Sequence, residues 1–156
     1  MDDDVDAPWY QQVAMPALLR HARSAYGGAM RRALDDAGYG DVPGNGLYVL
    51  GGLALNEAIP LGDLIRQLRI SKQAAGQLVD TLAARGYLDR VVDADDRRRL
   101  TVALTDRGRD AAAVQASARS AIDAELETVC GAADIERTRR TLAVLCSIGQ
   151  RERDET

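Results

Sequence analysis

The segment from Val92 to Gly108, VDADDRRRLTVALTDRG, is the part of this chain that best predicts its fold. It begins at the end of one short apolar run and contains a second over residues 100–104. Three aspartates and three consecutive arginines, Arg97–Arg99, stand between the two runs. Two short apolar runs joined by a charged connection predict an antiparallel β-ribbon. A ribbon tip rich in guanidinium groups can contact phosphates or enter a DNA groove.

Two short helices and a turn are predicted immediately before this ribbon. The first helix runs from about Gly62 to Leu68. Ser71 then stands at the N-cap of a second helix, where its hydroxyl can accept a hydrogen bond from a free backbone N–H. That helix ends near Arg85, since Gly86 is a residue type that commonly terminates helices. A helix–turn–helix followed by a ribbon is a winged helix, which predicts a DNA-binding protein.

The rest of the chain is predicted to be helical as well, because apolar residues recur at 3.6-residue spacing. Residues 59–61 form an extended link, since Pro60 disfavours helix at Ile59. Thr105 is expected to cap the helix that follows the ribbon. The predicted helices cover about residues 9–37, 47–55, 62–68, 71–85, 105–130 and 133–150. We therefore predict a mostly α fold, a winged helix–turn–helix with a two-stranded β wing.

The composition fits one domain of 156 residues, of which 46% are hydrophobic. The net charge is −4, yet residues 61–109 carry +3 and the remainder −7, so the predicted DNA-binding segment is the basic part. No apolar run is long enough for a membrane span, and the acidic start MDDDVDAP does not resemble a signal peptide. We expect a cytoplasmic protein that does not contact membranes.

Cys130 and Cys146 are the only cysteines and His21 the only histidine. This excludes an ordinary zinc site built from cysteine and histidine, and no metal or other cofactor is predicted. Both cysteines fall on apolar helical faces and are expected to be buried as small hydrophobic residues. The sequence also lacks a glycine-rich phosphate loop and a nucleophile motif, so we do not expect an enzyme.

The helix that begins at Ser71 is the candidate recognition helix. Gln73 and Gln77 lie one turn apart, and glutamine can pair with adenine through a donor and an acceptor. Lys72 and the N–H groups near Ser71 suit phosphate. Inside a helix, glycine at position 76 lowers the stability of the helix by about 1 kcal/mol relative to alanine. Close approach of either DNA or another helix to the glycine would offset this cost. Asp80 stands at the edge of the same face.

The ribbon tip supplies the second set of candidate DNA contacts. Arg97 and Arg98 can lie along a minor groove, attracted by its negative potential. Asp93 or Asp96 can hold one guanidinium in place through a bidentate pair.

The long helices predict a homodimer. The helix from about residue 105 to 130 would measure about 37 Å, more than a domain of this size needs for its own core. Together with the first and last helices it presents an alanine- and leucine-rich surface that suits a second copy of the chain.

From about residue 47 to residue 108, the chain resembles the multiple-antibiotic-resistance regulator (MarR) family of bacterial repressors. The matching segments are LGDLIRQLRIS, KQAAGQLVDTLAARGYLDR and DADDRRRLTVALTDRG. The resemblance implies a homodimer on double-stranded DNA with a pseudo-palindromic operator, and release by a small aromatic or phenolic effector. We divide the chain into an acidic N-terminus (residues 1–8), expected to be disordered because it holds four aspartates and little to bury, and a single MarR-like domain (9–156). In that domain, residues 9–46 and 109–150 are the long N- and C-terminal dimerisation helices and 47–108 the DNA-binding region.

Two positions depart from the family pattern. Arg69 stands in the turn where many members have glycine, and Gln77 replaces a basic residue, which alters the base edges that can be read.

The aromatic residues and the histidine outside the ribbon are the candidate walls of an effector pocket. They are Trp9, His21, Tyr26 and Tyr48. The three aromatic side chains are equally suited to the core or a dimer interface, which is the interpretation we favour. For His21 we favour a place on the surface or in an interface.

Two alternatives remain at this point. A winged helix can serve as a protein-interaction module that does not bind DNA, which the net charge of −4 favours. A regulator of the predicted kind can also be switched by oxidation of Cys130 or Cys146.

Overall fold

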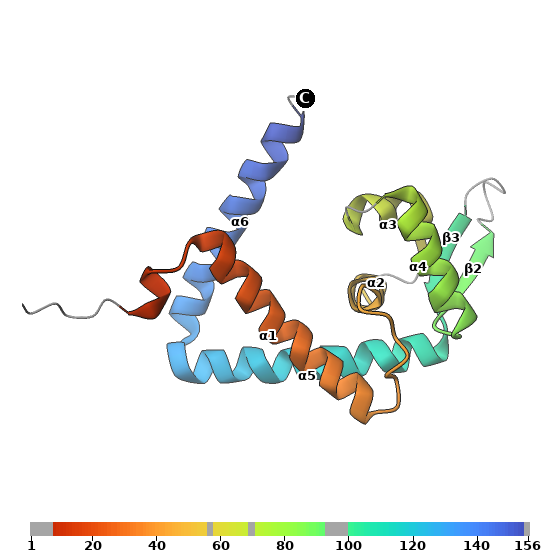
Figure 1. Ribbon diagram of the computed structural model, residues 1–156, viewed down its shortest axis with the longest axis horizontal. Coiled ribbons are helices and arrows are strands. Elements are labelled where there is room, and N and C mark those ends of the chain that lie inside the picture. The colour runs from red at the N-terminus through yellow and green to blue at the C-terminus, as the bar shows by residue number, and fades with distance from the viewer. Residues whose placement is uncertain (1–7, 56–57, 69–70, 93–99, 155–156) are drawn as a thin grey trace, which may run out of the picture. The chain divides into compact units, whose positions relative to one another are not determined.

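In the computed structural model, the chain is described over residues 8–55, 58–68, 71–92 and 100–154. Its elements follow one another as shown in Figure 1. They are η1 (Trp9–Gln11), α1 (Met15–Asp36), α2 (Gly46–Leu53), β1 (Ile59–Pro60), α3 (Leu61–Leu68), α4 (Lys72–Ala84), β2 (Leu88–Val92), β3 (Leu100–Leu104), α5 (Asp106–Cys130) and α6 (Ala132–Asp154). The mostly helical winged helix–turn–helix predicted from the sequence is confirmed, with α3 and α4 as the helix pair and β2 and β3 as the wing.

The chain forms two compact units. The first comprises residues 1–119 and so includes every element from η1 to the N-terminal half of α5. The second comprises residues 120–156, which hold the end of α5 and all of α6.

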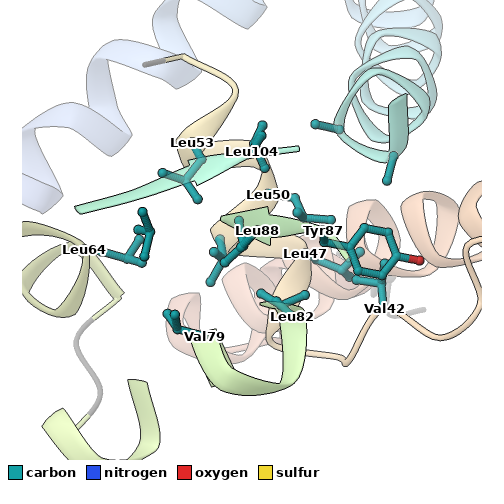
Figure 2. Packing of buried hydrophobic residues seen from close by; sticks show 14 of the residues in the cluster. Val42, Leu47, Leu50, Leu53, Leu64, Val79, Leu82, Tyr87, Leu88 and Leu104 are labelled. Atoms are coloured by element: carbon teal, nitrogen blue, oxygen red, sulfur yellow. The ribbon is translucent and has the colours of Figure 1, made fainter. Parts of the chain in front are cut away.

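One cluster of buried side chains forms the core of the first unit (Figure 2). Leu47, Leu50 and Leu53 recur every three residues and bury one face of α2, while Val79 and Leu82 bury the inner face of α4. Burying an aliphatic side chain of this size stabilises the fold by about 1.5–3 kcal/mol. The cluster also contains Leu34, Val42, Val49, Ile59, Leu64, Tyr87, Leu88, Val102, Leu104, Ala111 and Ala112. The core therefore joins α4 to α2, to the sheet and to the start of α5.

The sheet has three strands in the order β1-β3-β2, all antiparallel. In the wing, Leu88 pairs with Leu104 and Val92 with Leu100. On the other edge of β3, Ile59 pairs with Val102. The two-stranded prediction was therefore incomplete, because the segment expected to be only an extended link forms β1. This pairing joins residues far apart in the chain, which no local pattern reveals.

The first α-helix begins later than predicted. Residues Trp9–Gln11 form one turn of 3-10 helix, and α1 begins only at Met15. Pro16 falls in the first turn of α1, where its missing N–H removes no helical hydrogen bond and its fixed φ suits a helix start. The predicted helix start at Trp9 was wrong, because the spacing of apolar residues does not indicate where η1 ends and α1 begins.

The other helices lie close to their predicted bounds. Thr105 caps α5 as expected, since its Oγ1 accepts a hydrogen bond from Gly108 N at 3.0 Å. Gly131, with φ of 81°, separates α5 from α6. Caps and terminating glycines are local signals, which is why the sequence placed these ends correctly.

Candidate nucleic-acid interface

The predicted recognition helix is α4, and it begins at the predicted cap. Ser71 has an extended backbone, with φ of −63° and ψ of 153°, and its Oγ accepts a hydrogen bond from Ala74 N at 3.1 Å. This bond satisfies one of the N–H groups that lack a partner inside the helix. Lys72 is exposed at the same end, so its charge adds to the positive end of the helix dipole. An anion is favoured there.

The two faces of α4 differ in exposure as the sequence predicted. Ala75, Val79 and Leu82 are buried at helical spacing. Gln73 and Gln77 are exposed one turn apart. An exposed helix face of this kind fits a major groove, and carboxamides on it can contact neighbouring base edges.

Gly76 lies on α4 between the two glutamines. A Cβ placed on it would meet no atom within 4 Å. No described part of the chain therefore packs against this glycine closely enough to require it. The sequence allowed two reasons for a glycine inside this helix. Close packing of another helix in the chain is not observed, so close approach of DNA is the reason that remains.

The wing is described only along its strands. The β2–β3 ladder ends at the pair Val92–Leu100, and this antiparallel pairing is the predicted ribbon. The predicted contacts at the tip lie outside the described residues, and so does Arg69 in the turn before α4. The tip residues Asp93, Asp96, Arg97 and Arg98 remain predictions.

An ion pair that the sequence did not predict joins α4 to the wing. Arg90 of β2 contacts the carboxylate of Asp80 on α4. Both side chains are largely exposed, so the pair contributes at most about 1 kcal/mol to stability. The ion pair nevertheless neutralises the carboxylate of Asp80, a residue that the sequence placed at the edge of the candidate DNA-binding face.

The base of the wing is tightly packed and requires glycine at position 108. A Cβ on Gly108 would lie 2.1 Å from the carbonyl oxygen of Tyr87. Thr105 N donates to that same carbonyl at 3.1 Å, and Thr105 Oγ1 donates to Gly86 O at 2.6 Å. Gly86 itself has φ of 76°, a conformation that favours glycine. The first turn of α5 therefore packs directly on the chain reversal between α4 and β2.

Tyr87 and Asp41 shift each other's pKa at this base. The Tyr87 hydroxyl donates to Asp41 Oδ1. This hydrogen bond lowers the pKa of Asp41, and the nearby Arg107 guanidinium lowers it further. Burial raises the pKa of Tyr87, and the bond to the Asp41 carboxylate raises it further. The contact joins residues distant in the chain, and nothing in the local sequence indicated it.

A cavity of about 420 Å³ is lined by residues of α1, α2 and α5. Tyr26 and Tyr48, two of the four predicted effector-pocket residues, line it together. The other two, Trp9 and His21, are exposed and are not among its lining residues. The structure therefore brings only the two tyrosines to one cavity.

Two polar features of this cavity were not predicted from the sequence. Gln115 is only 3% exposed, and its Nε2 donates to Leu47 O at 2.9 Å. Its Oε1 has no hydrogen-bond partner among the described residues. Tyr48 is held in place by Arg23, whose Nε donates to the hydroxyl at 2.6 Å and whose guanidinium carbon lies 4.5 Å from the ring centre.

Cys130 and Cys146 are both free and exposed. The prediction that they are buried is wrong for the single chain, because other parts of the chain do not cover the faces that carry them. Within the described ranges, no group of three or more His, Cys, Asp or Glu side chains could hold a metal ion. None of the helices described here is long and apolar enough to cross a membrane.

Residues 41–99 match the model of the MarR family. Among solved structures, NadR in complex with 4-hydroxyphenylacetate has a TM-score of 0.69 and 22% identity, over 85% of this chain and 92% of that chain. Ligand-free NadR has a TM-score of 0.73 and 20% identity, over 88% and 97%. Wild-type MarR from E. coli in its apo form has a TM-score of 0.64 and 17% identity, over 85% and 96%. At these identities the structures show a shared fold. No curated protein matches the chain in sequence.

Proposed function

We propose that this chain is a MarR-family regulator that binds specific DNA sequences as a homodimeric repressor. The match of residues 41–99 to the MarR family model and the fold shared with NadR and MarR support this proposal. The observation that carries this proposal is the exposed face of α4. This face begins with the cap at Ser71 and the cation of Lys72. It continues with the carboxamides of Gln73 and Gln77 and with open space at Gly76. Phosphate contacts at the helix start would fix the register, and the carboxamides would read bases.

The charge distribution supports the same proposal. Residues 61–109 carry +3 although the whole chain carries −4. Phosphates would therefore be attracted to the winged-helix region, and the acidic remainder would oppose contact elsewhere.

The apolar surface of α6 supports the homodimer. Val144, Leu145 and Ile148 are each about half exposed in the single chain. Apolar side chains gathered on one helix commonly mark an interface. We propose that a second copy covers them, so that two recognition helices read the two halves of a pseudo-palindromic operator.

We further propose that a small aromatic or phenolic effector binds the cavity lined by Tyr26 and Tyr48 and releases the DNA. The volume of about 420 Å³ lies within the usual range for small-molecule sites. A hydroxyl or N–H group of the ligand would satisfy Gln115 Oε1, whose burial without a partner is otherwise unfavourable. Arg119, also in the lining, suits an anionic group on the ligand.

Selection from a random duplex library, followed by fluorescence anisotropy at two salt concentrations, tests DNA binding. We expect one enriched pseudo-palindromic sequence, bound more weakly at higher salt with a log–log slope of about −0.9 for each phosphate neutralised. Gln73→Ala should relax the sequence preference, whereas the matched control Gln11→Ala, at an exposed glutamine of η1, should not. A wild-type protein that enriches no sequence would refute the proposal and favour a protein-interaction module.

The effector proposal is tested on the selected DNA with 4-hydroxyphenylacetate and phenylacetate, which differ by one hydroxyl. We expect the hydroxylated compound to release DNA at lower concentration, because it can donate to Gln115. Gln115→Glu should alter the response to both compounds, since it places a negative charge in the cavity. If neither compound nor any other small phenol changes DNA affinity, effector release is refuted while DNA binding stands.

A further inference from the structure

Asp41 lies in the connection between α1 and α2 and contacts three other segments. Its carboxylate accepts hydrogen bonds from the Tyr87 hydroxyl and from Arg107 Nη2, the latter at 3.1 Å. Its backbone carbonyl accepts from Arg85 Nη1. Arg85 is the C-cap residue of α4, Tyr87 directly precedes β2, and Arg107 lies in the first turn of α5. One residue is therefore bonded to the recognition helix, to the base of the wing and to the long helix.

The partners of Asp41 also contact one another. Arg107 Nη2 donates to the Tyr87 hydroxyl at 3.0 Å, and its guanidinium carbon lies 4.6 Å from the Tyr87 ring centre. The same guanidinium lies 5.5 Å from the ring of Tyr39, which meets Tyr87 edge-on at 6.3 Å. These contacts join Arg107, Tyr87 and Tyr39 into one cluster, and the carboxylate of Asp41 is bonded to two of its three members. A change at Asp41 is therefore felt at both ends of the wing base, at Tyr87 before β2 and at Arg107 in α5.

The connection that carries Asp41 is itself fixed. Val42 is buried, and its carbonyl accepts a hydrogen bond from Arg31 Nη1 at 2.6 Å. A Cβ on Gly40 would lie 3.1 Å from Asp35 Oδ1, so this segment is also close to the end of α1. Asp41 is thus anchored to α1 and is not a side chain on a free loop.

We infer that Asp41 is a positioning residue for DNA recognition: its contacts to Arg85, Tyr87 and Arg107 set the orientation of α4 and the wing for base readout. The inference rests on the proposed DNA-binding function. Base readout requires side chains within about 0.5 Å of their productive positions. The side chain of Asp41 is 46% exposed, so its ion pair with Arg107 adds little to global stability. Its loss should therefore reduce sequence-specific affinity more than it reduces stability.

The inference about Asp41 can be tested because removing its negative charge should by itself raise, not lower, the affinity for DNA. Asp41→Asn removes one negative charge, which by itself strengthens binding to any DNA. Asp36→Asn makes the same charge change at an exposed position at the end of α1 and is the matched control. We expect Asp41→Asn to bind the selected operator about five- to tenfold more weakly while its affinity for unrelated duplex is unchanged or higher. Asp36→Asn should bind both DNAs as tightly as the wild type or more tightly.

Tyr87→Phe provides a second variant that keeps the buried ring and removes only the hydroxyl. It should lower the ratio of operator affinity to non-specific affinity in the same direction as Asp41→Asn, with an unchanged sedimentation coefficient and far-UV circular dichroism spectrum. Wild-type ratios in both Asp41→Asn and Tyr87→Phe, or equal losses on operator and unrelated DNA, would overturn the inference. A wild-type protein without any selective DNA binding would instead refute the proposed function.

Discussion

Replacing Gly76 with alanine should stabilise the protein and weaken its binding to DNA. Gly76 is the fifth residue of the 13-residue α4, so it lies in the helix interior, and its φ is not in the left-handed region. The added methyl group would meet no atom within 4 Å. The full difference in helix propensity, about 1 kcal/mol, should therefore appear as added stability. For a chain of this length that raises Tm by about 2–4 °C.

The opposite sign is expected for DNA affinity. Gly76 lies between Gln73 and Gln77 on the surface proposed to enter the groove, and a helix that docks closely leaves no room for an extra methyl group. Overpacking of one methyl group in a close contact costs about 1–3 kcal/mol. The affinity for the operator should therefore fall by about 5- to 150-fold.

Urea unfolding at one fixed protein concentration measures the stability, and anisotropy with the selected operator measures the affinity. Gly51→Ala is the matched control, since a Cβ on this residue of α2 also meets nothing within 4 Å. It should gain similar stability and keep wild-type DNA affinity. A Gly76→Ala protein that gains stability and binds the operator as tightly as the wild type would refute close approach of DNA to this residue. A Gly76→Ala protein that is less stable than the wild type would refute the reasoning that an added methyl group fits there without a clash.

Three further outcomes follow from the same structure. Gly108→Ala should destabilise the protein by about 3 kcal/mol, because its Cβ would lie 2.1 Å from a backbone oxygen, and urea unfolding will show whether the cost is this large. Folding raises the pKa of Tyr87. The protonated Tyr87 side chain therefore makes its full contribution to the stability of the protein below the ordinary tyrosine pKa, and this contribution is lost as the pH rises through the pKa of Tyr87 in the folded protein. Tyrosinate absorbance should therefore show late ionisation that Tyr87→Phe removes, and Asp41→Asn should bring the pKa of Tyr87 closer to the ordinary tyrosine value. Arg97→Ala and Arg98→Ala should each weaken operator binding and reduce the salt slope by about one contact, with the oligomeric state unchanged in sedimentation; unaltered slopes in both would contradict the wing contacts.

The local features of this chain could be predicted because each depends on neighbouring residues. The cap at Ser71, the terminating Gly86 and the cap at Thr105 all involve hydrogen bonds or backbone angles within a few positions. The inner and outer faces of α4 followed from helical periodicity in the same way. The recognition-helix half of the candidate interface was therefore visible in the sequence, down to the exposure of Gln73 and Gln77.

The effector cavity could be predicted only in part. The sequence offers aromatic residues, and Tyr26 and Tyr48 do line one cavity. Nothing in the pattern separated them from Trp9, which forms part of η1, or indicated that Gln115 of α5 completes the lining with a buried oxygen. A cavity depends on which helices pack together, and periodicity states only that a face is apolar.

The sequence was sufficient for the order of the main helices and the two wing strands, for the winged helix–turn–helix, and for the exposed face of α4 that is the candidate recognition surface. Only the tertiary structure decided that Ile59 pairs with Val102 as a third strand, that Arg90 holds Asp80, and that Asp41 joins three elements. The physical reason is the range of the interactions. Helix propensity, capping and turn chemistry act between neighbours in the chain, whereas strand pairing and hydrogen bonds between elements join residues that become neighbours only when the buried core brings them together.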